Sequence, residues 1–324
     1  MTVPLSVIMT VYNGEPFLRD AVECLLNQTY RDFELVVVDN GSQDASLKVL
    51  RGYEDSRLQI VELGQNIGRT AVLNVALGAA RGSLVAVQDA DDVSLPERLE
   101  KQVSWMSQHP NVVLLGTWCE YIDEGDNHIA YFRPPTTHQE IVDAFAAHTP
   151  FIHSSVMYRR HPIEELGGYP TDFVHGQDGA LWGHVICRGL EVANLPVGLV
   201  RARLHSGQLS ASAGMKLVKS WEFIRVHRQI EAQADLTPAA RKLAKRTVVT
   251  YTFRHGALLC RDGCWIEGLR TIGSALACYR GLVLRDMRIG WWIVRVALVQ
   301  IRERVVKKSW KALNSRIASL RASA

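Results

Sequence analysis

Several features that mark common protein classes are missing from this chain of 324 residues. It has no run of about 18 uncharged apolar residues, so we expect no membrane-spanning helix. Its first residues enter a strand-like pattern without the basic leader and cleavage site of a signal peptide. No Gly-x-Gly-x-x-Gly follows the first apolar run, which argues against a dinucleotide-binding oxidoreductase. We therefore expect a cytoplasmic protein.

Cysteine pairs with metal-binding or redox spacing are also absent. None of the six cysteines forms a Cys-x-x-Cys motif. Cys260 and Cys264 lie near His255, but a fourth zinc ligand is missing. This pattern is typical of free thiols in a reducing compartment.

An excess of positive charge is absent outside the C-terminal region. The net charge is +4, yet residues 280–324 carry eleven Lys or Arg against two acids, a local +9, so residues 1–279 sum to −5. A nucleic-acid-binding protein would carry its positive charge over the folded domain. We expect no nucleic-acid partner.

What the chain does contain is a regular alternation of apolar β-branched runs with helical stretches. Strands are predicted at 5–12, 33–39, 57–62 and 83–88, with helices at 14–27, 44–51 and 68–80 between them. This spacing predicts an α/β fold with a parallel sheet covered by helices on both faces.

The rhythm changes after residue 92, and the chain becomes helical after about residue 215. Further helices are predicted at 96–108, 138–147 and 177–188, with strands at 112–117, 153–158 and 199–204. We predict an α/β domain over 1–214 and a helical region over 215–324 with a basic amphipathic tail at 281–324.

Polar, glycine-rich or acidic residues follow each of the first four predicted strands. Ligands of open parallel sheets bind beyond the carboxyl ends of the strands, so four such endings predict one binding rim. The four endings are Thr10–Gly14, Asp39–Ser42, Gly64–Gly68 and Asp89–Asp92.

The fourth ending places three carboxylates, Asp89, Asp91 and Asp92, directly after an apolar strand. Their mutual repulsion would be relieved by a hard divalent cation such as Mg²⁺ or Mn²⁺, and that cation would suit a diphosphate. The alternative is that Asp92 or Ser94 merely caps the following helix. Asp39 could accept hydrogen bonds from a base or ribose, or could simply form a turn.

An ordered set of motifs from about Pro4 to Ser212 resembles the family 2 glycosyltransferases of the GT-A type. The motifs are Ser6–Gly14, Leu26–Tyr30, Val38–Asp44, Asn66–Gly68, Ala80–Gly82, Asp89–Asp92, Ser94–Gln102, His153–Arg159 and Gly167–Tyr169. The resemblance implies a Rossmann-like central mixed, mostly parallel sheet and an inverting sugar transfer that depends on Mn²⁺ or Mg²⁺.

The resemblance also implies roles for individual residues. Asp178 would be the general base that takes the proton of the acceptor hydroxyl. Asp91 and His205 would bind the metal. The nucleotide-sugar, expected to be a UDP-sugar, would meet Thr10, Val11, Tyr12, Asn13, Asp39, Asn66, Arg69 and Asp89.

Four positions depart from the family pattern: Asn40 replaces an Asp, Gln177 replaces the acid before the base, and Gly179-Ala180 replace a bulkier pair. At Asn40 one nucleotide contact loses its charge, while the turn can survive. The changes around Asp178 predict either an altered acceptor or a damaged site. Two alternatives to an active transferase therefore remain, a decayed transferase-fold module and a sugar-phosphate nucleotidyltransferase. The latter class normally has a phosphate loop after the first strand, which Tyr12–Pro16 does not resemble.

The tail from Arg285 has the pattern of an amphipathic helix with Trp291, Trp292 and Trp310 among basic residues. Such a segment suits an anionic membrane surface, and the alternative is a helix packed on the protein. We expect a glycan or lipid-linked acceptor in cell-surface polysaccharide synthesis, and an enzyme that works peripherally at the inner face of the membrane.

Overall fold

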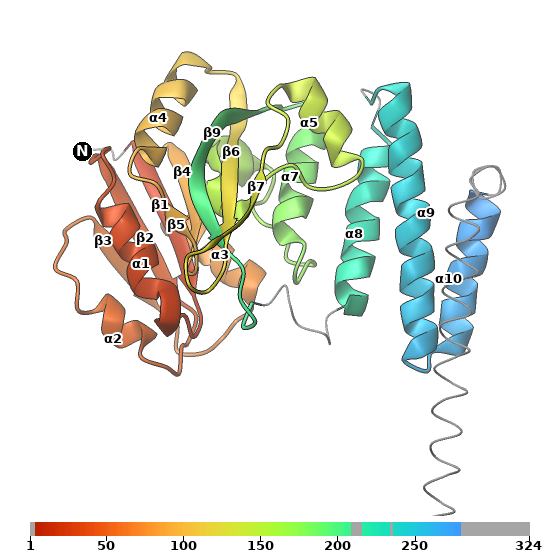
Figure 1. Ribbon diagram of the computed structural model, residues 1–324, viewed down its shortest axis with the longest axis horizontal. Helices are drawn as coiled ribbons and strands as arrows, with labels where there is room; N and C mark the ends of the chain where they lie inside the picture. Colours follow the sequence, from red (N-terminus) through yellow and green to blue (C-terminus); the bar gives the residue numbers. More distant parts are fainter. Residues whose placement is uncertain (1–3, 209–215, 234–235, 280–324) are drawn as a thin grey trace, which may run out of the picture. The chain divides into compact units, whose positions relative to one another are not determined.

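The computed structural model describes residues 4–208, 216–233 and 236–279 (Figure 1). The predicted amphipathic tail lies outside these residues. The strands are β1 (Leu5–Val11), β2 (Phe33–Asp39), β3 (Leu58–Glu62), β4 (Leu84–Asp89), β5 (Val93–Ser94), β6 (Val112–Ile122), β7 (His128–Phe132), β8 (Met157–Arg159) and β9 (Glu191–Arg203). The helices are α1 (Glu15–Leu26), α2 (Ser46–Leu50), α3 (Arg69–Ala79), α4 (Arg98–Gln108), α5 (His138–Phe145), α6 (Arg160–Glu165), α7 (Gln177–Cys187), α8 (Lys216–Glu231), α9 (Pro238–Arg261) and α10 (Trp265–Cys278), with a 3₁₀ turn, η1, at His153–Ser155.

The described strands form one mixed sheet in the order β3-β2-β1-β4-β8-β6-β9-β5, with β7 paired to β6. β3, β2, β1 and β4 are parallel, β8 runs antiparallel to both β4 and β6, and β6 and β9 are parallel again. The α/β fold with a mixed sheet is therefore confirmed. In the register of the first half, Thr10 pairs with both Val38 and Asp89, so the ends of β1, β2 and β4 meet at one edge.

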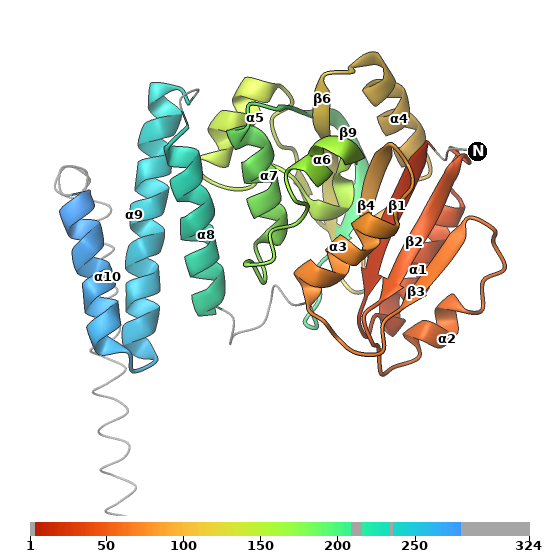
Figure 2. The same ribbon diagram turned by 180° about the vertical axis from the view of Figure 1, so that it is seen from behind.

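Helices cover both faces of the sheet because the strand side chains alternate between two cores. On β1, Ile8 packs in a core shared with α3, α5 and α7, whereas Val7 and Met9 pack in a second core with α1 and α4. Figures 1 and 2, which view opposite sides, show α1, α2 and α4 over one face and α3, α6 and α7 over the other. Both faces are buried, which explains why these strands read as continuous apolar runs.

The second half of the sheet differs from the predictions in all three predicted strands. The strand predicted at 153–158 is the 3₁₀ turn η1 followed by the short strand β8. The strand predicted at 112–117 extends to Ile122 and forms a hairpin with β7, which we did not predict. The strand predicted at 199–204 begins at Glu191. Pro196 and Gly198 are unfavourable inside a strand, but the register between β6 and β9 shifts at this point, which is where a sheet tolerates such residues.

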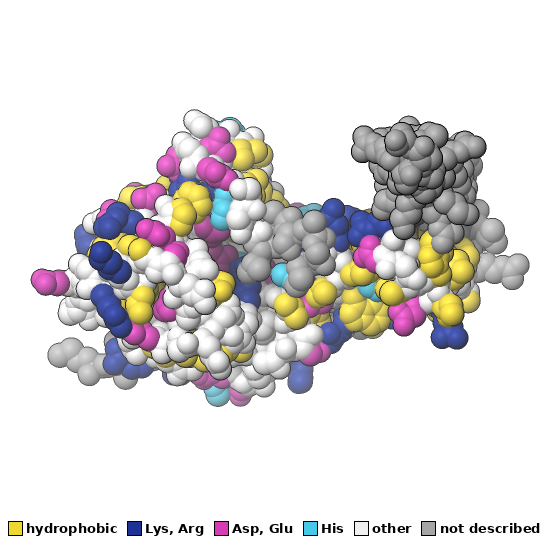
Figure 3. Space-filling view, turned by 90° about the horizontal axis from the view of Figure 1, so that it is seen from below, with side chains coloured by type: hydrophobic (Ala, Val, Ile, Leu, Met, Phe, Trp, Pro, Cys, Tyr) yellow, Lys and Arg dark blue, Asp and Glu magenta, His cyan; other side chains and the backbone are white. Residues whose placement is uncertain are grey.

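The chain divides into two compact units, Met1–Ala244 and Lys245–Ala324. The first unit runs beyond the predicted boundary at 214/215 and includes α8, because Val226 and Ile230 pack in the larger core with α7. Within the described ranges, no helix is both long and apolar enough to cross a membrane. Exposed hydrophobic side chains occur on the helical part in Figure 3, and on α10 they include Ile266 and Leu269, which are 69% and 61% exposed.

Candidate functional site

The loops after β1 and β2 are joined by hydrogen bonds at the predicted rim. The backbone N–H of Asn13 donates to Ser42 Oγ at 3.0 Å, and the N–H of Gln43 donates to Asn13 Oδ1 at 2.8 Å. Asn13 has a φ of 53°, a left-handed conformation that Asn adopts more readily than most residues. Tyr12 beside it is 47% exposed and available to a ligand, whereas the Val11 side chain packs in the core.

Asp39 ends β2 with one carboxylate oxygen in use and the other without a partner. Its Oδ2 accepts the backbone N–H groups of Gly41 at 3.1 Å and Ser42 at 3.0 Å. Its Oδ1 is buried and has no hydrogen-bond partner within the described residues. A buried acceptor without a partner is costly, so this oxygen is suited to an N–H group of a bound ligand.

Asn40, a departure from the family pattern, links this turn to the loop before α3. Its amide donates to Asn66 Oδ1 at 3.1 Å and accepts the N–H of Ile67 at 2.9 Å. An ionised Asp could accept but could not donate to Asn66. Gly41 lies against the same loop with a φ of 76°, and a Cβ there would stand 2.6 Å from the backbone of Gln65. Asn40 therefore has a structural role that requires its amide.

Asp89, at the end of β4, is held by two basic side chains. His153 Nδ1 lies 3.0 Å from Asp89 Oδ1, and Arg69 Nη2 lies 3.4 Å from each oxygen of the Asp89 carboxylate. Burial opposes ionisation, but His153 and Arg69 outweigh it and hold the pKa of Asp89 well below its ordinary value. Asp89 is therefore a fixed anion.

His153 is a functional candidate that stood in a family motif of the sequence but was assigned no role there. It is 5% exposed, and its other ring nitrogen lies 3.1 Å from the hydroxyl of Tyr169. These contacts fix the ring against Asp89. A histidine at the start of a predicted apolar strand was the available signal, yet the partner is 64 residues away and only the fold reveals it.

Asp92 does not join the other two carboxylates. It is 5% exposed and accepts the hydroxyl of Ser154 and the backbone N–H of Arg203, the latter at 2.8 Å. Burial and the nearby charges of Asp91 and Asp89 raise the pKa of Asp92 well above its ordinary value. The expectation that three carboxylates share a cation is therefore wrong for Asp92, and it does not cap α4 either.

Asp91 and His205 lie side by side, as expected for a metal-binding pair. His205 Nε2 is 3.0 Å from Asp91 Oδ2, and the ring packs against Phe17 with centroids 4.9 Å apart. Carboxylate and imidazole together suit Mn²⁺, and two protein ligands leave positions for diphosphate oxygens and water. No cluster of three or more His, Cys, Asp or Glu ligands occurs in the part of the chain that the structure describes. The pair therefore fits a cation that shares its coordination with the substrate.

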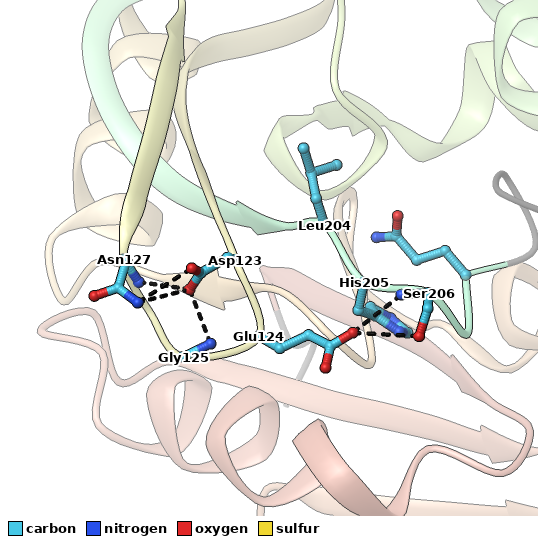
Figure 4. A pocket seen from close by; sticks show the side chains of 8 residues that line it. Asp123, Glu124, Gly125, Asn127, Leu204, His205 and Ser206 are labelled. Atoms are coloured by element: carbon cyan, nitrogen blue, oxygen red, sulfur yellow. Dashed lines mark hydrogen bonds between the residues drawn. The ribbon is translucent and has the colours of Figure 1, made fainter.

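A cavity of about 610 Å³ opens beside His205 (Figure 4). It lies between the β6–β7 turn and the segment after β9. Glu124 connects its two walls by accepting the N–H of Ser206 at 3.1 Å. The lining residues are Asp123, Glu124, Gly125, Asn127, Leu204, His205, Ser206 and Gln208. The cavity provides room for a substrate next to His205.

Arg69 brings the predicted base into the same site. Burial lowers its pKa, but the charges of Asp89, Asp178 and Asp91 outweigh this effect and raise it above the ordinary value. Gln177, oriented with its amide oxygen toward Arg69, accepts from Arg69 Nε at 2.9 Å. Asp178 follows in the first turn of α7, and within the described residues no hydrogen bond or ion pair is seen for its side chain. Arg69 therefore contacts the donor-binding candidate Asp89 directly and the base candidate Asp178 through the neighbouring Gln177.

Comparison with known proteins identifies the family of this chain. The glycosyl transferase family 2 model matches residues 6–167. The amylovoran biosynthesis glycosyltransferase AmsE of Erwinia amylovora is 34% identical over 66% of this chain and 82% of its own. The structure of S. aureus TarS 1-349 in complex with UDP-GlcNAc superposes with a TM-score of 0.64 at 19% identity, over 95% of this chain and 92% of that one.

A second solved structure, the mannosyltransferase PcManGT from Pyrobaculum calidifontis with GDP-Man and Mn²⁺, has a TM-score of 0.58 at 19% identity, over 92% of this chain and 86% of its own. At this identity the two structures establish the fold, while the family model and the relative establish the class of enzyme. The chain is a glycosyltransferase and belongs to family 2.

Proposed function

We propose that this enzyme transfers a sugar, with inversion at the anomeric carbon, from a UDP-sugar to a hydroxyl group of a glycan or lipid-linked acceptor. The observation that carries the proposal is that Arg69 pairs with Asp89 and donates to Gln177, which directly precedes Asp178, while Asp91 pairs with His205. A donor-binding anion, a metal ligand and an acid–base group are the parts that sugar transfer from a nucleotide diphosphate needs.

Asp39 and the loops around it would bind the nucleotide. The free Oδ1 of Asp39 would accept the N3–H of uracil, while Tyr12 and Asn13 line the same rim. Asp89, fixed as an anion by His153 and Arg69, would accept a ribose hydroxyl. Asn66 would act indirectly, because its side chain accepts from Asn40 and from the N–H of Gly68.

Asp91 and His205 would hold the divalent cation, and when bound, Mn²⁺ or Mg²⁺ neutralises the charge of the leaving diphosphate. TarS with UDP-GlcNAc and PcManGT with GDP-Man and Mn²⁺ support both the donor class and the metal. Asp178 would take the proton of the acceptor hydroxyl as that oxygen attacks the anomeric carbon from the face opposite the diphosphate. One displacement inverts the configuration.

The proposal also covers the acceptor and the cellular location of the enzyme. AmsE is described as an amylovoran biosynthesis glycosyltransferase, which supports a role in polysaccharide synthesis. Residues 280–324 carry a charge of +9, and each basic residue near an anionic lipid surface contributes about 1 kcal/mol to binding. We infer a cytoplasmic enzyme that docks at the inner face of the membrane, where lipid-linked acceptors are found.

Hydrolysis of UDP-glucose and UDP-N-acetylglucosamine with Mn²⁺ tests the chemistry in three proteins: wild type, Asp91→Ala and Asp178→Asn. We expect wild type to release UDP and both variants to be at least about 100-fold slower. Equal rates in all three would refute the assigned roles. Nucleotide binding without turnover would favour the decayed module, and release of pyrophosphate from UTP and a sugar phosphate would favour the nucleotidyltransferase.

A panel of nucleotide-sugars in thermal unfolding identifies the donor independently. A ligand at 100 times its Kd stabilises the folded state by about 2.7 kcal/mol. We expect uridine nucleotides to raise the Tm more than guanosine or adenosine nucleotides. A larger shift with GDP-sugars would overturn the choice of UDP.

A further inference from the structure

The start of α7, which carries Asp178, is held from outside the matched family region by a carboxylate on α8. Gly176 precedes α7 and cannot cap it with a side chain. Glu222 Oε1 accepts the N–H of Val174, and its Oε2 accepts the N–H groups of His175 at 3.0 Å and Gly176 at 2.9 Å. Three successive backbone donors immediately before the helix therefore share one acidic side chain.

Burial of the Glu222 carboxylate costs free energy that its hydrogen bonds must offset. Glu222 is 3% exposed, and an ionised carboxylate loses much solvation when it is buried. Backbone N–H groups and the positive end of a helix compensate for that loss.

The same segment is fixed on its other side by α3. The Thr70 hydroxyl donates to the carbonyl of Phe173, and Arg69 donates to the amide oxygen of Gln177. From α8, Arg225 pairs with Asp172. Residues 172–177 are thus held between α3, which carries the donor-binding Arg69, and α8.

The Asp178 carboxylate has no hydrogen-bond partner of its own in the described residues, so its direction depends on the backbone of the first turn of α7. We propose that Glu222 is a positioning residue for Asp178, which makes α8 part of the catalytic machinery although it lies beyond residues 6–167. This inference rests on the proposed role of Asp178 as the base. A displacement of about 1 Å at such a group costs roughly 100-fold in rate.

The test is Glu222→Gln, which keeps the shape but turns one acceptor into a donor that faces backbone N–H groups. Glu165→Gln, which makes the same charge change at an exposed site on α6, is the matched control. Hydrolysis of the UDP-sugar that wild type turns over gives kcat and KM with Mn²⁺, UDP titration gives Kd, and thermal unfolding reports folding. In Glu222→Gln we expect kcat to fall roughly 10- to 100-fold, while KM and the Kd for UDP stay within about twofold of wild type. We expect Glu165→Gln to match wild type in all three quantities.

A purely structural role would instead weaken UDP binding and turnover together. The double variant Asp178→Asn/Glu222→Gln separates the cases further, since a residue that acts only through Asp178 adds no loss once the base is gone. Should Glu222→Gln not fold, Glu222→Asp, which keeps the charge on a shorter side chain, takes its place with the same expected split.

Each result has a distinct meaning. Unchanged kcat in Glu222→Gln together with a slow Asp178→Asn would overturn this inference and leave the proposed function standing. Unchanged kcat in Asp178→Asn would overturn the assignment of the base itself. Multiplied losses in the double variant would show that Glu222 acts independently of Asp178 and would also overturn the inference.

Discussion

Replacing Asp39 by Asn should weaken UDP binding while leaving the fold intact. The carboxylate has two separate tasks: Oδ2 accepts the N–H groups of Gly41 and Ser42, and the buried Oδ1 has no protein partner within the described residues. The Asn amide can keep the first task by placing its oxygen toward the turn. The opposite orientation would set its NH₂ group against two N–H donors, so the first orientation is favoured.

The magnitude follows from the atom that then faces the base. An NH₂ group replaces the acceptor that we assign to uracil N3–H, and a hydrogen bond to a charged group contributes about 1.5–3 kcal/mol. The Kd for UDP should therefore rise roughly 10- to 150-fold. The turn keeps both hydrogen bonds but to a neutral acceptor, so the free energy of unfolding should fall by only about 1–2 kcal/mol.

Isothermal titration with UDP and CDP measures the effect. Cytosine N3 is an acceptor, so the NH₂ group that the Asp39→Asn substitution introduces suits CDP, and the preference for UDP over CDP should shrink or reverse. Asp39→Ala is the comparison variant, because it loses the turn hydrogen bonds as well and should unfold more easily. A Kd for UDP within twofold of wild type in Asp39→Asn would refute the assignment of Asp39 to the base.

Four further outcomes are expected. Asp91→Ala and His205→Ala should each raise the Mn²⁺ concentration needed for half-maximal donor hydrolysis by at least about tenfold, since each removes one of the two proposed protein ligands. An unchanged Mn²⁺ requirement in both variants would place the metal elsewhere. Arg98→Ala should lower the free energy of unfolding in urea by about 3–5 kcal/mol, because it removes a large buried side chain whose guanidinium donates to five described acceptors. A loss under about 1 kcal/mol would contradict this. Burial opposes the charge of Glu34, but hydrogen bonds from Ser6 and Arg81 outweigh this effect and lower its pKa. The charged form of Glu34 therefore stabilises the fold above about pH 4.3, and this stabilisation is lost as the pH falls through the lowered pKa. The free energies of unfolding of wild type and Glu34→Gln, measured by urea titration, should converge in acid, and a difference that does not change with pH would contradict this. Truncation before Gly281 should abolish sedimentation with anionic phosphatidylserine vesicles at low salt, and undiminished binding would remove the tail from the membrane model.

Much of the first half of the molecule followed from the sequence because its signals are local. Each of β1 to β4 is an apolar run followed by a polar ending, so order and direction alone place those endings at one edge. The pairing of Thr10 with both Val38 and Asp89 confirms that reasoning. The family motifs predicted that Asp91 and His205 lie together, and in the fold His205 Nε2 is 3.0 Å from Asp91 Oδ2.

Long-range packing decided the rest. Asp89, Asp91 and Asp92 look equivalent in the sequence, yet the backbone N–H of Arg203, 111 residues away, turns Asp92 into the interior. The early start of β9 includes Pro196 at a register shift against β6, and no local pattern encodes such a shift.

The sequence by itself determined the class of fold and the chemical types at the rim, because both depend on residue order and hydrophobic periodicity. Only the tertiary structure decided which groups are turned toward the site and what holds them there. His153 reaches Asp89 and Glu222 reaches the start of α7 from distant segments. The charge on Asp89 and the placement of Asp178 depend on those contacts, which form only when the chain is folded.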